Sequence, residues 1–457
     1  MISLILLGAV ITLAVGAVAK FYLDRSASRY EIDKKEFAIV GFVMCLVVIP
    51  GTAYVGIQMA IKNQVTYVET WSGWEEEAVW IKTKCSRDGP CIREYDCDPY
   101  IVMVDYECGT SEQPRTCQRP ETRYHDCPYT TYEWTFKVET TVGDHTIAYH
   151  NLPTNPDQHR WRSGVRVPDR YASGVPAFWA AVDARLKANS PGPACARKTY
   201  DNYILASQSS ILQRFNDSIE RYSNDGLLPA VAQTADVRDF YALDRVYFAG
   251  MTVGGDWQGA VQRFNAAFGT MLQGDLHLVI VNANTVTDRH NYFGALMAYW
   301  QSEAFGDQAL SKNGLVIAVG TKDGKTIEWA KAGTGMPIGN EMLVVQLEDD
   351  LKGQALTPEN ILGHATASFD GAGELDIKPH GKLADIVWGP NKFKRVSMSG
   401  DGDDAAGFSY LLNEIEPTTG QKIGILFVVF LFACIGWGIS IAYGERMGFH
   451  RSYNRRY

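Results

Sequence analysis

The sequence lacks the short motifs that identify common hydrolase and nucleotide-binding families. No HExxH motif, Walker A loop or G-x-S-x-G elbow occurs in its 457 residues. Each of these motifs needs a fixed spacing to bring metal ligands, phosphate-binding N–H groups or a nucleophile together. The pair Gly333-x-Gly335 continues with Met-Pro, which predicts a tight turn, and Ser409 lacks the second glycine of an elbow. The sequence alone therefore names no reaction.

Basic residues are outnumbered by acidic ones, at 43 Lys and Arg against 52 Asp and Glu, which gives a net charge of −9. An acidic protein repels the phosphates of nucleic acid, so the composition argues against nucleic-acid binding. Internal repeats and long low-complexity tracts are also absent.

Cysteine pairs with the C-x-x-C spacing of zinc sites are missing, although nine cysteines are present. Six cysteines cluster in a polar, loop-like stretch with few groups that could build a core: Cys85, Cys91, Cys97, Cys108, Cys117 and Cys127. An even set of this kind outside the cytoplasm favours three disulfide bonds, with the pairing left open. A metal site with His125 as an added ligand is the alternative. Cys45 and Cys434 lie in apolar runs, whereas Cys195 is either free or bridged to another chain.

Three long uncharged apolar runs are present, at Ile2–Ala19, Phe37–Ile61 and Ile423–Tyr443. Runs of this length predict transmembrane helices. Pro50-Gly51 interrupts the second run and predicts a kink. Ala17-Val18-Ala19 could instead end a cleaved signal peptide, but the run lacks a basic segment before it, which favours a retained helix.

The distribution of basic residues predicts the orientation in the membrane. Five basic residues lie between the first two runs and four follow the third: Lys20, Arg25, Arg29, Lys34 and Lys35, then Arg446, Arg451, Arg455 and Arg456. Loops rich in Lys and Arg stay in the cytoplasm, so residues 62–422 are expected outside the cytoplasmic (inner) membrane, on the periplasmic side. This extracytoplasmic segment carries a charge of about −13.

Short aromatic-rich segments near the cysteines predict a small antiparallel sheet. They comprise residues 65–71, 78–81, 100–104, 132–138 and 146–149, with Ser72-Gly73 as the first hairpin turn. The Trp-Ser-Gly-Trp turn, the cysteine-rich insert and the segment TTVGDHTI resemble uncharacterised membrane proteins of large bacteriophages and bacteria. That resemblance covers about residues 65–200 and implies no activity.

The stretch from Leu276 to Gly335 predicts strand, helix, strand, turn and strand. Two buried strands, Leu276–Val281 and Leu315–Val319, flank a helix that ends near Trp300, and Asp323-Gly324 predicts a hairpin back into residues 326–329. Helices interleaved with apolar strands predict an α/β layer structure with helices on both faces of a mixed sheet. Further expected elements are an edge strand within 240–248, helices at 176–189, 211–222, 257–271 and 342–351, and strands at 383–388 and 393–398.

These residues resemble the TPM-domain family over about residues 239–369. The resemblance rests on the strand Leu276–Val281, the helix ending at Trp300, the turn Asn313-Gly314 into an apolar strand, and Gly333-Thr334-Gly335. Lys312 stands where the family usually has an acidic residue. The resemblance implies a small extracytoplasmic α/β module. Its members have been linked to phosphatase activity, photosystem repair and receptor modulation, so a fold is implied better than a reaction.

The predicted organisation is an α+β membrane protein with three transmembrane helices, a disulfide-rich antiparallel β domain and a TPM-like α/β domain. Its parts are a first transmembrane helix with cytoplasmic loop (1–36), a second helix (37–61), the cysteine-rich β domain (62–195), the α/β domain (196–400), a linker (401–422), a third helix (423–443) and a basic cytoplasmic tail (444–457).

Carboxylates offer the remaining candidate chemistry. Asp288, Asp307 and Asn313 are expected on loops at the edges of the central sheet, where α/β proteins place ligands, and are candidate metal or phosphate-ester ligands. Acidic loop residues could bind Ca²⁺ or remain solvated, namely Asp401, Asp403 and Asp404. Glu348, Asp349 and Asp350 are expected on a solvated helix face or an intermolecular contact. His290 and His364 are candidate general bases, each isolated in sequence.

Three functional hypotheses follow from these patterns. The first is a non-enzymatic scaffold that is anchored in the lipid bilayer and homo-oligomerises on the membrane surface. The second is a phosphatase or other hydrolase of the TPM type. The third is a binding module that modulates another membrane protein.

Overall fold

The computed structural model describes residues 2–25, 32–84, 94–110, 113–128, 132–149, 175–207, 210–232, 244–336, 338–398 and 407–443. The chain divides into two compact units. The first unit comprises Met1–Val68, Thr199–Arg214 and Val396–Tyr457, and the second comprises Glu69–Lys198 and Phe215–Arg395.

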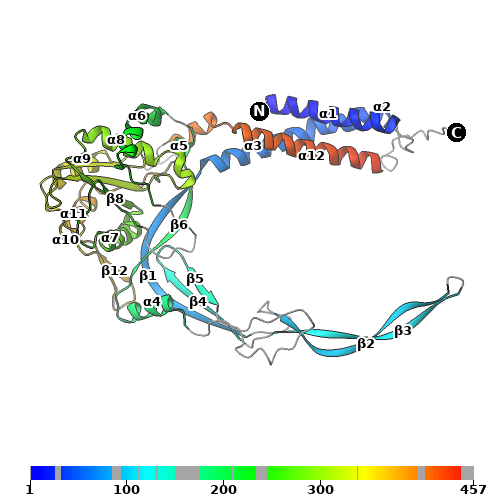
Figure 1. Cartoon of the computed structure of the whole chain (residues 1–457), viewed down its shortest axis with the longest axis horizontal. Helices are drawn as coiled ribbons and strands as arrows, with labels where there is room; N and C mark the ends of the chain where they lie inside the picture. Colours follow the sequence, from blue (N-terminus) through cyan, green and yellow to red (C-terminus); the bar gives the residue numbers. More distant parts are fainter. Residues whose placement is uncertain are drawn as a thin grey trace. The chain divides into compact units, whose positions relative to one another are not determined.

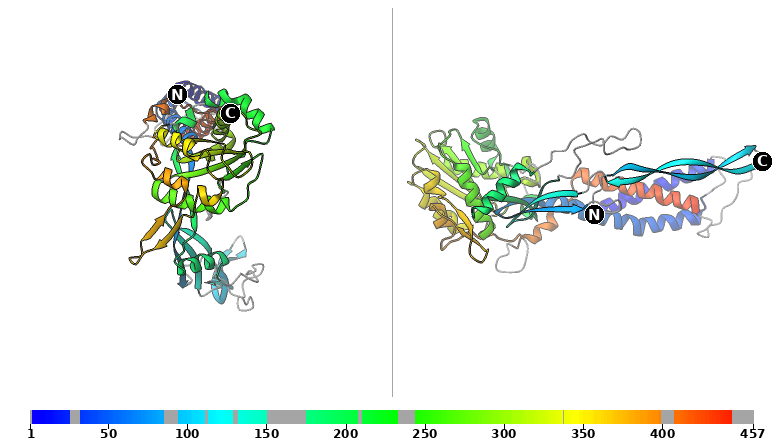
Figure 2. Two further views of the ribbon diagram at one scale, coloured as in Figure 1. Left: turned by 90° about the vertical axis from the view of Figure 1, so that its left-hand side faces the viewer. Right: turned by 90° about the horizontal axis from the view of Figure 1, so that it is seen from below.

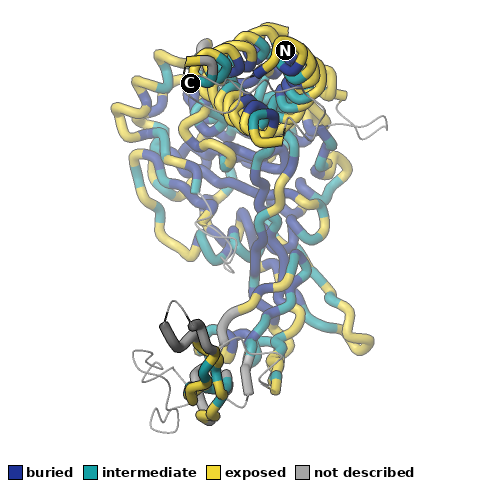
Figure 3. The backbone as a smooth tube through the Cα atoms, turned by 90° about the vertical axis from the view of Figure 1, so that its right-hand side faces the viewer, coloured by how far each residue is buried: buried dark blue, intermediate teal, exposed yellow. Residues whose placement is uncertain are grey.

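The first unit is built on three helices that are long and apolar enough to span a membrane. Helix α1 (Ile2–Arg25) and helix α12 (Thr419–Tyr443) pack side by side, and α12 also packs against α3 (Ile49–Val65). Many large apolar residues of these helices are exposed, and the exposed stretches of the helices are yellow in Figure 3. Apolar surface of this extent is stable only in lipid, so the chain is a membrane protein.

The second candidate span is continuous but not uniformly α-helical. Helix α2 (Lys34–Val43) passes through a π-helical segment, η1 (Met44–Val48), into α3. Pro50 lies in the first turn of α3 and has no N–H to donate, so the hydrogen-bond ladder widens immediately before it. Helix α3 runs through Pro50-Gly51, where a kink was predicted, and the departure from α-helical geometry is the π segment about one turn earlier.

Polar groups join the spans in the interior of the bundle. Trp437 donates its indole N–H to the carbonyl of Thr12 at 3.0 Å, and the hydroxyl of Ser440 donates to the carboxylate of Glu36. A Cβ at Gly16 would lie 2.4 Å from the ring of Trp437, so only glycine admits the indole there. These contacts fix which faces of α1, α2 and α12 meet.

A four-stranded antiparallel sheet begins the second unit, in the order β5-β4-β1-β6. Its strands are β1 (Thr66–Lys84), β4 (Tyr132–Thr140), β5 (His145–Tyr149) and β6 (Pro193–Asp201). The predicted hairpin turn at Ser72-Gly73 is wrong, because β1 runs through it as one long strand. Gly73 serves close packing instead, since a Cβ there would lie 2.1 Å from the hydroxyl of Thr141.

The helix predicted at 176–189 is confirmed as α4 (Ala177–Lys187), and it covers this sheet. Trp179 donates its indole N–H to the carbonyls of Val79 and Lys137, at 3.1 and 2.9 Å. Its ring also packs edge-on against Phe136 at 5.3 Å. The helix thereby bridges β1 and β4.

A long two-stranded antiparallel hairpin lies between β1 and β4 in the sequence. It consists of β2 (Glu94–Thr110) and β3 (Gln113–Pro128) and is named here the ribbon. The two cyan strands twist around each other (Figures 1 and 2). Among the helices and strands that the structure describes, β2 and β3 pack extensively only with each other.

The α/β part of the second unit has a mixed sheet in the order β10-β9-β8-β7. Strands β7 (Val246–Ala249), β8 (Asp275–Asn282) and β9 (Gly314–Thr321) are parallel, and β10 (Trp329–Thr334) returns antiparallel to β9. The hairpin predicted at Asp323-Gly324 is confirmed, although its second strand begins at Trp329.

Helices cover both faces of this sheet, which confirms the predicted layers (Figure 1). One face packs against α7 (Trp257–Leu272), α9 (Glu341–Leu351), α10 (Pro358–Ile361) and α11 (Lys382–Val387). The other packs against α8 (Arg289–Trp300), and α6 (Ser210–Asn224) packs on α8. The side chains of Asp256, Asp288 and Thr357 cap α7, α8 and α10.

Two predicted strands are wrong. Residues 383–388 form α11, and residues 393–398 form no strand. A short apolar run does not distinguish a strand from a buried helical turn, and Leu383, Ile386 and Val387 are all buried against α9 and α10. The remaining elements are α5 (Tyr203–Ser207), η3 (Glu303–Gln308), η4 (Phe408–Glu414) and a small hairpin of β11 (Thr366–Phe369) and β12 (Leu375–Lys378).

Candidate functional sites

A polar pocket lies at the carboxyl ends of the parallel strands β8 and β9. Its volume is about 490 Å³, and it is lined by Ala283, Val286, Thr287, Asp288, Arg289, His290, Lys322, Glu328 and Trp329. The loops that follow parallel strands meet at this edge of an α/β sheet, which is where such folds bind ligands. The pocket is therefore the candidate small-molecule site of the α/β part.

Three of the charged groups around this pocket have structural partners, namely Asp288, Lys322 and Glu328. Asp288 accepts the backbone N–H of Asn291 at 3.0 Å and so caps helix α8. Lys322 lies 3.4 Å from Glu328 across the hairpin. Arg289 and His290, in the first turn of α8, are exposed. The pocket can thus receive a small polar ligand, but its residues do not form a nucleophile–base pair.

The acidic turn beside the pocket is ordered by hydrogen bonds. Asp323 accepts the backbone N–H groups of Lys325 and Thr326, at 2.8 and 3.1 Å. These bonds lower the pKa of the Asp323 carboxyl below its usual range. Asp323 therefore stays ionised and shapes the hairpin.

The structure does not bring Asp288 and Asn313 to one place. Asn313 precedes β9 at the amino end of the strands, whereas Asp288 follows their carboxyl end. The amide of Asn313 is buried and donates to the carbonyls of Thr70 and Gln273, at 3.2 and 3.0 Å. Asp307 lies in η3, before β9. Shared metal binding by these three residues is not supported by this arrangement, because carboxylate and amide oxygens must converge to bind a cation.

Other predicted site residues are dispersed. Among the residues that the structure describes, no three His, Cys, Asp or Glu side chains gather as metal ligands would. Asp401, Asp403 and Asp404 lie outside the described residues, and His364 and Ser409 are exposed. Glu348 was expected on a solvated face, but it pairs with Lys331 and accepts the N–H of Ala332 at 3.3 Å.

A buried charge network occupies the amino end of the same sheet. Arg245 and Asp275 form an ion pair at 2.8 Å, and both side chains are at least 94 % buried, being 6 % and 2 % exposed. The imidazole of His277 lies 3.3 Å from Asp275 through Nε2 and 3.2 Å from the hydroxyl of Tyr247 through Nδ1. Asn265 adds a hydrogen bond to Asp275 at 3.3 Å. Every member of the network thus has a partner, as buried polar groups require.

The electrostatics of the network follow from this geometry. Burial alone would raise the pKa of Asp275, but Arg245 and then His277 outweigh it and hold the pKa at about 2. Burial, reinforced by Arg245, lowers the pKa of His277, so its imidazole is neutral. Burial raises the pKa of Tyr247. The neutral phenol therefore donates to Nδ1, which leaves the proton of His277 on Nε2, toward Asp275.

The same network attaches β1 to the α/β part. Arg245 donates to the hydroxyl of Thr70 at 3.1 Å and to the carbonyl of Ala232 at 2.8 Å. Sequence reasoning missed Arg245 and Asp275, although a usable signal existed. Asp275 and His277 interrupt an otherwise apolar strand at alternate positions, which puts both on one face. Because the network is closed to solvent, it stabilises the fold and is not a ligand site.

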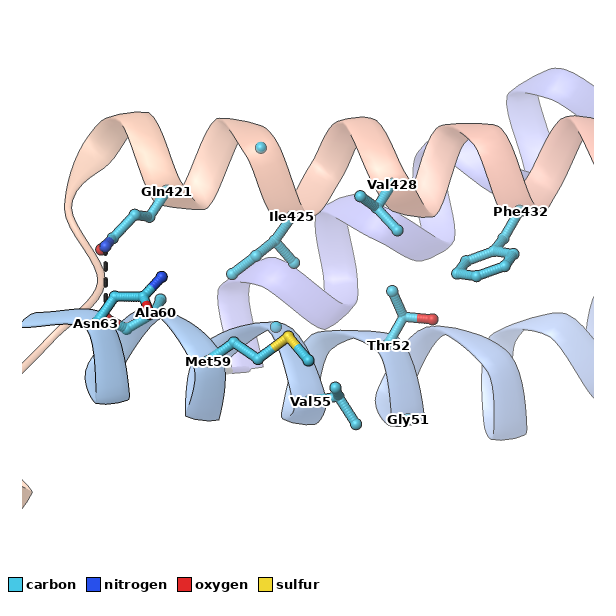
Figure 4. A pocket seen from close by; sticks show the side chains of 12 residues that line it. Gly51, Thr52, Val55, Met59, Ala60, Asn63, Gln421, Ile425, Val428 and Phe432 are labelled. Carbon is cyan, nitrogen blue, oxygen red and sulfur yellow. Dashed lines mark hydrogen bonds between the residues drawn. The ribbon is translucent and has the colours of Figure 1, made fainter. Parts of the chain in front are cut away.

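In the first unit, a groove of about 570 Å³ runs between α3 and α12 (Figure 4). Apolar side chains line most of it, among them Val55, Met59 and Val428. At one end Gln421 donates to the carbonyl of Ala60 at 3.4 Å. In a bilayer, acyl chains would fill this groove, and nothing else in its lining points to a specific ligand.

The ribbon is a candidate interaction surface. On one face, Tyr100 stacks on His125 with ring centres 4.5 Å apart, and the guanidinium of Arg119 lies 5.6 Å from the ring of Tyr106. The opposite face presents Ile101 and Met103, which are 71 % and 54 % exposed. On the first face the aromatic rings pair with side chains of β3, whereas on the second face Ile101 and Met103 are the more exposed apolar side chains, next to the exposed polar Asp105.

Cys117 is the one clustered cysteine whose side chain the structure describes, and it is disulfide-bonded. The side chains of Cys85, Cys91, Cys97, Cys108 and Cys127 lie outside the described residues. Cys195 is a buried thiol in β6. Three disulfides in this region, and their pairing, remain a prediction.

Comparison of the chain with protein-family models, with curated proteins and with solved structures found no match. The resemblance to the TPM domain therefore remains a prediction that rests on the residues quoted above.

Proposed function

We propose that this protein is a membrane-anchored structural or assembly protein that forms homo-oligomers on the outer face of the cytoplasmic membrane. The three apolar helices support the anchoring. The Lys and Arg residues next to the spans support an extracytoplasmic position for residues 62–422. The disulfide at Cys117 also favours an oxidising compartment.

The observation that carries the oligomeric part is the open apolar face of the ribbon. An isolated two-stranded hairpin is only marginally stable in water, and Ile101 and Met103 expose apolar surface on it. Burying these side chains against another polypeptide removes that surface from water. A second copy supplies such a polypeptide without any further component.

The particle mass after extraction in mild detergent tests this proposal. Light scattering with the detergent contribution subtracted is expected to give a multiple of the 50.7 kDa chain mass. The double variant Ile101→Thr with Met103→Thr keeps strand propensity but removes the apolar groups, and it is expected to shift the particle toward one copy. The matched control, Arg119→Lys with Arg123→Lys, changes two exposed positions of β3 on the opposite face and should leave the mass unchanged. A strictly monomeric wild-type particle refutes the proposal. A second polypeptide that co-purifies in constant ratio with a single copy favours the binding-module hypothesis instead.

The location is tested separately, by protease added to intact spheroplasts. Cleavage within residues 62–422 is expected while the tail after Tyr443 stays protected. Protection of the middle segment, or reduced clustered thiols in native material, contradicts an extracytoplasmic position.

Hydrolysis of a phosphate ester is the second candidate function, and the pocket at the carboxyl end of the sheet favours it. Arg289 and His290 in the first turn of α8, and Lys322 just after β9, line this pocket, and basic groups at a helix N-terminus suit an anionic group. Turnover of a generic phosphomonoester that falls in His290→Gln and Asp288→Asn, but not in Asp307→Asn outside the pocket, supports this function. Absence of turnover with every divalent cation tested excludes it.

A further inference from the structure

The two outer edges of the ribbon differ in their capacity to pair with another strand. The edge of β3 carries Pro114 and Pro120, which have no N–H, and an ion pair between Arg123 and Glu121 at 3.5 Å. Prolines and charges are the devices that protect sheet edges from pairing. On β2, the segment Tyr100-Ile101-Val102-Met103-Val104 is uncharged, proline-free and rich in β-forming residues. The edge of β3 is therefore protected, whereas along β2 none of the described strands other than β3 is paired with it, so its outer edge is open within the described part of the chain.

The register of the ribbon shows which backbone groups face the open edge. Met103 lies opposite Pro120. Because Pro120 lacks an N–H, this pair cannot exchange both backbone hydrogen bonds, so it is of the non-hydrogen-bonded type. In such a pair the N–H and C=O of Met103 point away from β3. Those of Ile101 and Asp105, two residues away on either side, point the same way.

We propose that β2 pairs antiparallel with β2 of a second copy of this chain, with Val102 of one copy opposite Val102 of the other. The proposal rests on the homo-oligomeric function and specifies its contact. It joins two two-stranded ribbons into one four-stranded sheet by strand addition, which gains backbone hydrogen bonds along the open edge. Sheets of three or more strands with an apolar face are stable where a lone hairpin is marginal.

The sequence of β2 favours its own copy as the partner strand. With Val102 on the two-fold axis, Ile101 lies opposite Met103 of the second copy, and Tyr100 lies opposite its Val104. Every pair in this segment is then apolar or aromatic, and no like charges face each other. Shifting the centre to Met103 would place Ile101 opposite the acidic Asp105, so the Val102 register is preferred. The most exposed apolar side chains, Ile101 and Met103, then form one continuous patch across the two-fold axis.

Cysteine cross-linking in the full-length detergent-extracted protein tests this register. Val102 and its counterpart form a non-hydrogen-bonded pair, whose Cα spacing lies within the range of a disulfide. Val102→Cys is therefore expected to give a reducible covalent dimer under mild oxidation. The matched control is Glu121→Cys, which lies opposite Val102 within the ribbon, is equally half-buried and is on the protected edge. We expect at least about fivefold less dimer from the control, because its Cα atoms would lie beyond about 7 Å.

A second pair of variants tests the edge without new cysteines. Met103→Pro removes an outward N–H and keeps every bond to β3, whereas Gln118→Pro does the same on the edge of β3. Dissociation to one copy is expected for Met103→Pro only.

The outcomes separate this inference from the proposed function. If the wild-type particle contains several copies, three results would overturn the β2 contact and leave the oligomer standing. Val102→Cys gives no cross-linked dimer, Glu121→Cys gives as much dimer as Val102→Cys, or the Met103→Pro particle keeps its mass. A monomeric wild-type particle overturns both.

Discussion

Two hairpins of the second unit are held in opposite ways. The short hairpin, β11 and β12, has four residues in each strand, yet it packs on a cluster formed by Trp74, Ala266 and Ala367, with Ile377 partly buried against it. The ribbon has strands of 17 and 16 residues, and its apolar face is exposed. Length therefore does not decide whether a hairpin belongs to the core. Contact with a third element does.

The two hairpins consequently depend on different parts of the molecule. The short hairpin derives its stability from the domain beneath it. The ribbon is held by cross-strand pairs such as Tyr100 with His125, by the disulfide at Cys117 and, under the proposal above, by a second copy. Destabilising the core should therefore unfold the hairpin of β11 and β12 and leave the ribbon folded.

The largest effect is expected from breaking the buried ion pair. Asp275→Asn keeps the shape of the side chain but leaves Arg245 buried without its counter-charge, which typically costs about 3–5 kcal/mol in folding free energy. Hydrogen exchange should show β11 and β12 losing protection together with β8, while β2 and β3 keep theirs. Equal loss of protection in both hairpins would mean that the ribbon depends on the core after all.

In the unmodified protein, acid should weaken the α/β core through the same ion pair. The folded pKa of Asp275, about 2, lies below its usual value of 3.8, so this carboxylate stabilises the fold above pH 3.8 and ceases to do so as the pH falls toward 2. The contribution lost is about 2 kcal/mol. His277 acts in the same direction from about pH 6.5 downward, because the unfolded chain binds a proton that the buried imidazole refuses. Unfolding free energies of the α/β part measured between pH 7 and pH 3 should decline steadily. A flat profile contradicts the network.

The sequence was informative where a pattern has one structural solution. The uncharged runs identified the spans, and the apolar segments at 276–281 and 315–319 identified the two central strands of the mixed sheet. Side-chain caps depend on neighbouring residues alone: Asp256 accepts the backbone N–H of Gly259 at 3.0 Å, and Thr357 accepts that of Asn360 at 3.2 Å.

The sequence was uninformative where contacts between residues far apart in the chain decide the local structure. Ser72-Gly73 has turn chemistry, but the backbone of Ser72 lies against α7, where a Cβ at Gly269 would lie 2.1 Å from its carbonyl oxygen. Because β1 packs this closely on α7, its backbone stays extended through Ser72-Gly73. Similarly, Asp288 and Asn313 both flank the sheet, but only the order and direction of the strands show that they lie at opposite ends.

A smaller effect is expected from placing a charge on the packed hairpin. Ile377 lies opposite Ala367 and contacts the cluster around Trp74. Ile377→Lys replaces a partly buried isoleucine with a charged side chain, so a loss of about 1–2 kcal/mol in unfolding free energy is expected. Chemical denaturation measures it, and the oligomeric state should not change. Dissociation of the particle by this variant would show that β12, rather than β2, joins the copies.

The smallest effect on folding is expected from the same substitution on the ribbon. Ile101 is 71 % exposed, so Ile101→Lys should change the unfolding free energy of the second unit by no more than about 0.5 kcal/mol. Its effect on assembly should be large, because an added lysine at a sheet edge opposes strand addition and would face Met103 of the second copy. Unfolding free energy and particle mass should therefore be measured on each variant. Ile377→Lys is expected to lower the unfolding free energy and keep the mass, whereas Ile101→Lys is expected to keep the unfolding free energy and lower the mass. If Ile101→Lys lowers stability as much as Ile377→Lys and leaves the mass unchanged, the ribbon packs within its own chain and the difference between the two hairpins disappears.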